Sequence, residues 1–300
     1  MKPSLPTSVG RGVLAEPETP VDKGETKGRS NLVQRVLSAL VFVPGVLLLV
    51  EGGRWPLLGL VLVVAVRSAW EWCYLSRAAG YKPDLLLALP LTAGWVLVLS
   101  FAEAAPLFLY VMGSALLFFV AALRRGTERY TANALLGLGA VLYAGVLGSA
   151  PLLLVRSVGS GPEAYHLVAV LFISIWLTDA AAYFFGRQWG RKKLAPSISP
   201  GKTVVGFCGG LLGSLLPLLL YSLLPSFALV ELAGMFLLVG FGGQLGDLVE
   251  SAFKRDMGNV KDAPTLIPGH GGLLDRFDSY FFAFPLAYIY AEFLGVLRSL

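Results

Sequence analysis

The chain has 300 residues, of which 56% are hydrophobic and only 14% are charged. Ordinary soluble domains carry roughly 25% charged residues, so the composition excludes a typical water-soluble globule. The net charge of +5 is explained by membrane topology rather than by nucleic-acid binding. Both cysteines, Cys73 and Cys208, lie in apolar stretches, which excludes a disulfide scaffold and a cysteine-ligated zinc site.

The first 31 residues are rich in Pro, Gly, Ser and Thr and have no apolar period. Such a segment cannot bury enough apolar surface to order itself, so residues 1–31 are expected to form a flexible cytoplasmic tail. A secretory signal peptide is not expected, because the first long apolar run begins only near Leu32. Residues 32–300 are expected to form a single integral membrane domain.

Nine apolar runs follow, each able to cross a hydrocarbon core of about 30 Å as a helix. Helices are the expected structure, because an open sheet would leave backbone groups unpaired in lipid. The sequence therefore predicts an all-α, polytopic membrane protein. The predicted spans are 33–50, 56–75, 84–101, 105–123, 132–154, 166–186, 204–224, 227–248 and 279–297.

The distribution of lysine and arginine predicts how these spans are oriented. With nine spans, 21 of the 24 basic residues fall on one side of the membrane, and only Arg54, Arg156 and Arg298 fall on the other. Basic residues accumulate on the cytoplasmic side. The N-terminus is therefore expected inside and the C-terminus outside.

Acidic residues gather at the ends of the last two spans. Asp247, Glu250 and Lys254 are spaced i, i+3 and i+7, so they share one helix face. Asp275 and Asp278 stand at the head of the last span, where the helix dipole stabilises anions. Four converging carboxylates of this kind predict a magnesium-type site. The alternative is that they only form salt bridges with the neighbouring Lys254, Arg255 and Arg276.

A glycine run at residues 268–272 separates a basic loop from the two aspartates. Gly271 and Gly272 belong to this run, and glycines permit close approach of backbone N–H groups to an anion. An ordinary turn is the alternative. His270, within the run, is a candidate general acid, phosphate ligand or turn residue.

A second cluster follows the sixth span. Asp179 lies within that span, and the next loop contains Ser199, Lys202 and Thr203. Lys202 and Thr203 could bind a triphosphate by charge and hydroxyl contacts. The loop's other cations could instead reflect positive-inside topology or contact anionic lipid headgroups.

Glu71 lies near the cytoplasmic end of the second span. Arg67 precedes it by four residues, so the two side chains can meet on one helix face. We interpret Glu71 as a carboxylate that either snorkels to the membrane interface or forms an ion pair with Arg67.

Residues 251–278 resemble the signature of the phosphatidate cytidylyltransferase family, also called CDP-diacylglycerol synthases. Residues 179–186 and 194–203 are similar to further family motifs, so the resemblance covers about residues 176–280. It implies transfer of a cytidylyl group from CTP to phosphatidic acid, giving CDP-diacylglycerol and pyrophosphate. It also implies a multi-pass enzyme of the cell membrane whose active site faces the cytoplasm.

On this interpretation Asp247 and Asp275 are the primary Mg²⁺ ligands, with Asp278 and Glu250 as direct or water-mediated partners. A second cation is left open. The expected catalytic residues are Asp247, Lys254, Asp275 and Arg276. The expected substrate-binding residues are Asp179, Ser199, Lys202, Thr203, Arg255, Lys261, His270, Gly271 and Gly272.

Two other functions stay open on the sequence alone. A membrane lipid kinase that uses CTP or ATP would need similar acids and bases but would transfer the γ-phosphate. An ion-coupled transporter could use intramembrane aspartates as an ion path, although its acids should be spread across the membrane. Besides CTP, phosphatidic acid and membrane lipid, a second copy of the chain in a homodimer is a further open expectation.

Overall fold

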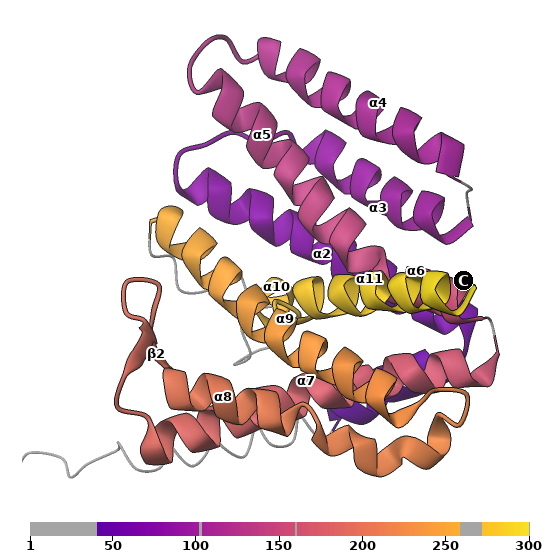
Figure 1. The fold of residues 1–300 in the computed structure, drawn as a ribbon. Helices are drawn as coiled ribbons and strands as arrows, with labels where there is room; N and C mark the ends of the chain where they lie inside the picture. The colour runs from indigo at the N-terminus through magenta and orange to yellow at the C-terminus, as the bar shows by residue number, and fades with distance from the viewer. Residues whose placement is uncertain (1–40, 102–103, 160, 259–271, 300) are drawn as a thin grey trace, which may run out of the picture.

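The fold is taken from a computed structural model that describes residues 41–101, 104–159, 161–258 and 272–299 (Figure 1). The predicted tail at 1–31 and the first part of the predicted span 33–50 lie outside the described residues. An apolar helix, Val41–Glu51, begins the described chain. The elements that follow are α2 (Arg54–Ala78), α3 (Leu85–Phe101), α4 (Ala104–Leu123), α5 (Tyr130–Ala140), η1 (Val141–Val146), η2 (Leu147–Ser149), α6 (Ala150–Val158), α7 (Pro162–Trp189), β1 (Lys193–Ala195), β2 (Ser199–Thr203), α8 (Val204–Gly213), η3 (Leu216–Leu223), α9 (Leu229–Asp256), α10 (Leu273–Arg276) and α11 (Tyr280–Ser299).

Apolar helices dominate the described part of the chain. Four are long and apolar enough to cross a membrane: Arg54–Ala78, Tyr130–Val158, Pro162–Trp189 and Leu229–Asp256. The shorter apolar helices are Val41–Glu51, Leu85–Phe101, Leu107–Leu123, Val204–Leu220 and Tyr280–Gly295. Each of the nine predicted ranges overlaps one of these helices, which is compatible with a helical membrane protein. The number of crossings and their orientation remain predictions.

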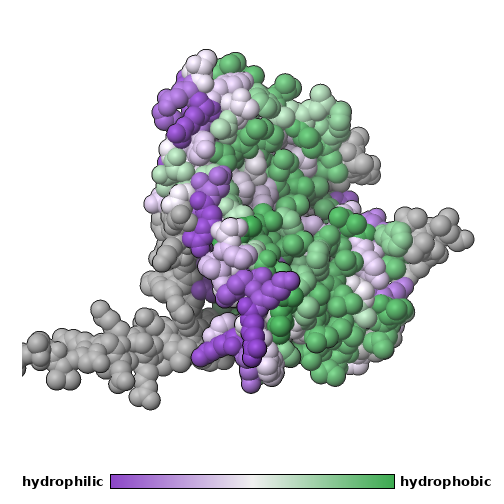
Figure 2. All heavy atoms as spheres, turned by 60° about the vertical axis from the view of Figure 1, so that its left-hand side comes forward, coloured by the Kyte–Doolittle hydropathy of each residue, from purple (hydrophilic) through white to green (hydrophobic). Residues whose placement is uncertain are grey.

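The surface agrees with a lipid environment. Figure 2 shows a broad hydrophobic face, with the most hydrophilic side chains gathered toward one side. Many large apolar side chains are exposed. Leu86, Leu219 and Val230, for example, are 87%, 86% and 75% exposed. Apolar surface of this extent marks contact with a membrane or another protein.

The fold departs from the all-α prediction at residues 193–203. There β1 and β2 pair as an antiparallel hairpin, with Lys193 opposite Thr203 and Ala195 opposite Ser199. Pro200 and Gly201 lie within β2, and both residue types weaken a strand. Because of these two residues, the sequence lacks the pattern that would have predicted a strand here.

Two predicted spans are not regular α-helices throughout. The range 204–224 divides into α8 and the 3₁₀ segment η3, where Pro217 removes one backbone donor and its ring opposes the preceding turn. The range 132–154 passes through the π-helical η1 and the 3₁₀ η2 before α6, which has Pro151 in its first turn. Proline accounts for the change of helix type at 216–223, and the missing N–H of Pro151 affects only the turn directly before α6.

Close helix packing builds the region that carries the motifs. The buried face of α8 consists of glycines and packs along α7, while α9 packs along α11 and α2 along α3. Small residues let helix backbones approach closely without a hydrophobic driving force from water. The glycines on this face are Gly206, Gly209, Gly210 and Gly213.

Candidate active site

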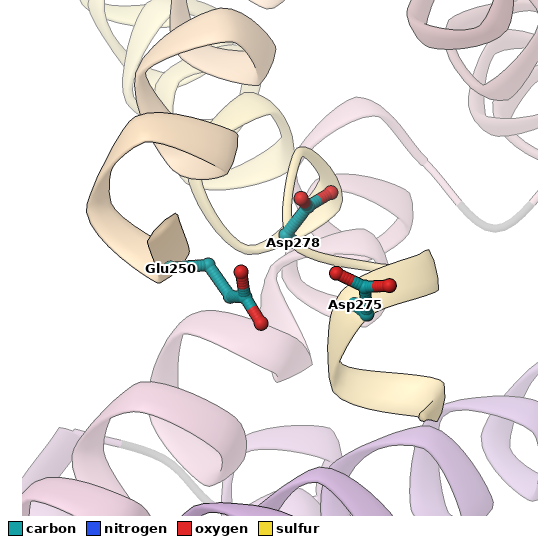
Figure 3. Close-up of side chains that lie close together, drawn as sticks. All are labelled: Glu250, Asp275 and Asp278. Carbon is teal, nitrogen blue, oxygen red and sulfur yellow. The ribbon is translucent and has the colours of Figure 1, made fainter. Parts of the chain in front are cut away.

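Three carboxylates from three elements converge at the cytoplasmic end predicted for α9. Glu250 lies on α9, Asp275 on α10, and Asp278 in the turn before α11 (Figure 3). One ligand oxygen from each of the three lies within 4.8 Å of the others. The α9 backbone can lie against this turn because residue 246 is glycine, and a Cβ there would overlap the carbonyl oxygen of Asp278.

Lysines pair with Glu250 and Asp275 of this group and with the nearby Asp247. Lys254 Nζ lies 2.5 Å from Asp275 Oδ1 and 2.8 Å from Glu250 Oε1. Lys202 Nζ lies 2.8 Å from Asp247 Oδ2, so a lysine also pairs with the acid outside the three-carboxylate group. The predicted alternative, in which the acids form salt bridges with neighbouring basic residues, is therefore confirmed for Lys254.

The arginines near these acids have different positions. Arg255 Nε donates to the carbonyl oxygen of Ile198, 3.3 Å away in the hairpin. Arg276 is exposed at the end of α10 and lines the cavity described next. Of these two arginines, the expected catalytic residue Arg276 lines the cavity, whereas the expected substrate-binding residue Arg255 contacts the hairpin backbone.

A cavity of about 1080 Å³ joins the two motif regions. Its charged lining comes from α7, the hairpin, α9 and the segment 272–278, so residues far apart in sequence face one space. The carboxylates are Asp179, Asp247, Asp275 and Asp278, and the cations are Arg187, Lys193, Lys202 and Arg276. Its apolar lining includes Phe42, Trp176 and Phe207. The cavity thus has room and charge for a polar ligand beside an apolar surface.

Thr203 has a local structural role that the sequence analysis missed. Its Oγ1 accepts a hydrogen bond from the Gly206 backbone N–H at 3.1 Å, so it caps the N-terminus of α8. A threonine directly before an apolar helical run is the signal that could have predicted this cap. Ser199 lies at the other end of β2, and Lys202 reaches Asp247 from the same strand.

Of the glycine run at residues 268–272, the structure describes only Gly272. Gly272 is buried, lines the cavity and precedes α10. Lys261, His270 and Gly271 lie outside the described residues, so their expected phosphate contacts remain predictions.

Glu71 is paired with Arg67, as predicted, with Arg67 Nε 2.8 Å from Glu71 Oε1. The carboxylate also accepts hydrogen bonds from the backbone N–H groups of Leu273 at 2.9 Å and Leu274 at 2.8 Å. These two contacts were missed, because no local sequence pattern connects residue 71 to residue 273.

Asp278 lies in a crowded acidic environment. Enclosure by protein, followed by repulsion from Asp247, Asp179 and Glu250, raises the pKa of the Asp278 carboxyl well above its usual value. Crowded carboxylates of this kind are stabilised by a positive charge. Their oxygen atoms are the hard ligands that Mg²⁺ prefers.

Apolar helices around a cavity lined by carboxylates and cations are compatible with a helical membrane protein that has a charged site. Residues 33–294 match the cytidylyltransferase family, and the chain belongs to this family.

Part of the chain is also similar to curated bacterial proteins named phosphatidate cytidylyltransferase. The protein from Staphylococcus saprophyticus is 51% identical over 123 residues, which are 40% of this chain and 47% of the relative. The protein from Staphylococcus haemolyticus is 49% identical over 123 residues, with the same coverage of 40% and 47%. The protein from Staphylococcus epidermidis is 51% identical over 117 residues, or 38% of this chain and 45% of the relative. The chain therefore spans about half the length of the curated relatives it matches.

Proposed function

We propose that the protein is a phosphatidate cytidylyltransferase, with residues 32–300 forming one catalytic domain. It transfers the cytidylyl group of CTP to the phosphate of phosphatidic acid. The observation that carries this proposal is the cavity that brings Asp247, Asp275 and Asp278 and the basic residues of α7 and the hairpin into one space. Family membership and the names of the relatives support it.

The cavity suits one water-soluble and one lipid substrate. Lys193, Lys202 and Arg276 supply positive charge for the triphosphate and the lipid phosphate. Phe42 and Trp176 give the same cavity an apolar part, which suits the glycerol end of a lipid whose acyl chains stay in the bilayer. We propose that the cavity faces the cytoplasm of the cell membrane, because 21 of the 24 basic residues fall on its side in the nine-span arrangement.

We propose that Mg²⁺ binds at the carboxylates. Glu250, Asp275 and Asp278 offer oxygen ligands close enough to share one ion, and Asp247 lines the same cavity. Bound there, Mg²⁺ would neutralise charge on the triphosphate and act as a Lewis acid. The sequence expectation of Asp247 as a primary ligand is retained in this proposal, as is the open question of a second cation.

The chemistry requires placement and charge neutralisation more than a protein nucleophile. An oxygen of the phosphatidic acid phosphate attacks the α-phosphorus of CTP, and a new phosphorus–oxygen bond forms. The bond between the α-phosphorus and the bridging oxygen breaks, and pyrophosphate leaves. Lys202, Lys254 and Arg276 stabilise the negative charge on the transferring and leaving groups.

Labelled CTP tests this function with the purified protein in detergent. Label at the α-phosphate should pass to the lipid, and label at the γ-phosphate should be released only as pyrophosphate. A lipid kinase would place the γ-label in the lipid and leave CDP. A transporter would form neither product while moving an ion or solute in liposomes. Either of these two results would contradict the proposed function.

A further inference from the structure

Glu71 connects the amino-terminal helices to the acidic cluster, although it is not among the residues that line the cavity. Its side chain is fully buried in α2, with 0% exposure. One carboxylate accepts from Arg67 at 2.8 Å and from the N–H groups of Leu273 and Leu274 at 2.9 and 2.8 Å. A buried carboxylate with three donors is held firmly in one position.

Those two N–H groups are the first of α10, and the start of a helix needs external acceptors for them. The usual source is the side chain of the preceding residue. That residue is Gly272, with φ −78° and ψ 165°, and it has no side chain to offer. Glu71 therefore caps α10 from another helix.

The glycine at 272 has a packing explanation in this arrangement. A Cβ on residue 272 would overlap the Glu71 carboxylate. Glycine is thus required for Glu71 to reach the backbone of α10. This contact accounts for Gly272 without a phosphate ligand.

We propose that Glu71 is a positioning residue that sets the place of Asp275 and Arg276 in the active site. The helix α10 is only four residues long, from Leu273 to Arg276. Fixing its first two backbone groups therefore fixes the two residues that follow. The functional part of this inference rests on the proposed function, whereas the capping contact can be tested without it.

Hydrogen–deuterium exchange tests the contact directly. In Glu71→Gln, a side-chain amide replaces one acceptor oxygen, so a donor opposes a donor at α10. Exchange of the peptide that contains Leu273 and Leu274 should become about tenfold faster or more, as expected when hydrogen bonds to a charged group are lost. Unchanged exchange in this peptide would overturn the proposal.

Asp84→Asn is the matched control. Asp84 is also a carboxylate near a helix start, where it accepts from the Leu87 N–H at 3.3 Å and lies 3.3 Å from Arg125. It makes these contacts at α3, away from α10. Its substitution should leave exchange at 273–274 unchanged, and faster exchange there would mean that general loosening explains the Glu71 result.

Metal binding separates positioning from a merely structural role. Loss of a group that orients a ligand typically weakens metal affinity by 10- to 100-fold. Mn²⁺ binding to purified Glu71→Gln, followed by electron paramagnetic resonance, should weaken by at least about tenfold. The Mg²⁺ concentration for half-maximal transfer should rise by a similar factor. Wild-type Mn²⁺ affinity in a folded variant would overturn the positioning role.

A rescue experiment uses the overlap at residue 272. Glu71→Ala removes the cap and makes room for a side chain, and serine is a favoured N-cap residue. Glu71→Ala combined with Gly272→Ser should exchange more slowly at 273–274 than Glu71→Ala alone, whereas Gly272→Ser alone should exchange faster than wild type. The absence of this reversal would contradict the capping geometry.

Lack of cytidylyl transfer by the wild type would count against the proposed function, and the exchange results would still decide whether Glu71 caps α10.

Discussion

Among the residues of the acidic cluster, substitution of Lys254 should have the largest effect on the unfolding temperature and on transfer activity. Its ammonium lies between Glu250 and Asp275, at 2.8 and 2.5 Å. Lys254→Met keeps the apolar stem of the side chain and removes its charged amino group. Glu250, whose side chain is 3% exposed, then loses its ion-pair partner.

The size of the effect follows from this burial. Removing one partner of a buried ion pair costs about 3–5 kcal/mol. The Asp275 side chain is 36% exposed, so water compensates for part of its lost partner, and the lower value of about 3 kcal/mol applies. For a chain of this size each kcal/mol lowers the unfolding temperature by about 2 °C. We therefore expect a decrease of about 6 °C without divalent cations.

Scanning fluorimetry in detergent measures this decrease. The control is Lys82→Met, which replaces an exposed lysine on the same predicted side of the membrane. Excess Mg²⁺ should stabilise Lys254→Met more than wild type, because a cation can replace the missing charge. Transfer activity should fall by about 100-fold or more, as expected for the loss of a preorganised charge. An unfolding temperature equal to that of the control would refute the pairing argument, and activity within about threefold of wild type would refute the catalytic role.

Two further predictions concern the acids and the topology. Asp275→Asn and Asp247→Asn should each lower turnover by at least about 100-fold with unchanged elution from a sizing column, because each removes a proposed metal ligand; activity near wild type would refute the metal assignment. In a background without Cys73 and Cys208, single cysteines in the amino-terminal tail and near Arg298 should react with impermeant reagents from opposite sides of the membrane, and labelling from one side would exclude nine spans.

Features that depend on neighbours in sequence could be predicted. Hydropathy is a local property, so every predicted range overlaps an apolar helix. The pair of Arg67 and Glu71 follows from a spacing of four residues and is confirmed. The helix α9 continues to Asp256, so Asp247, Glu250 and Lys254 do lie on one helix, as their spacing predicts.

Features that depend on distant segments could not be predicted. Nothing near Glu71 indicates that its carboxylate will cap α10, because its acceptor role is set by the packing of α2 against residues 272–276. The ion pair of Lys202 with Asp247 likewise requires the hairpin to lie beside α9. Pro217 was a visible signal for the irregular helix at 216–223, since proline disfavours an α-helical interior.

If the proposed function is right, the two sequence interpretations of the acidic cluster correspond to different states of one site. Without ligands, Lys202 and Lys254 neutralise Asp247, Glu250 and Asp275, since carboxylates this close would otherwise repel one another. A divalent cation at the same oxygens would take over that neutralisation and repel the ammonium groups. The lysines would then be available to phosphate oxygens, which arrive with the nucleotide and carry the opposite charge. On the proposed function, the salt bridges would stabilise the crowded acids until metal and triphosphate bind together.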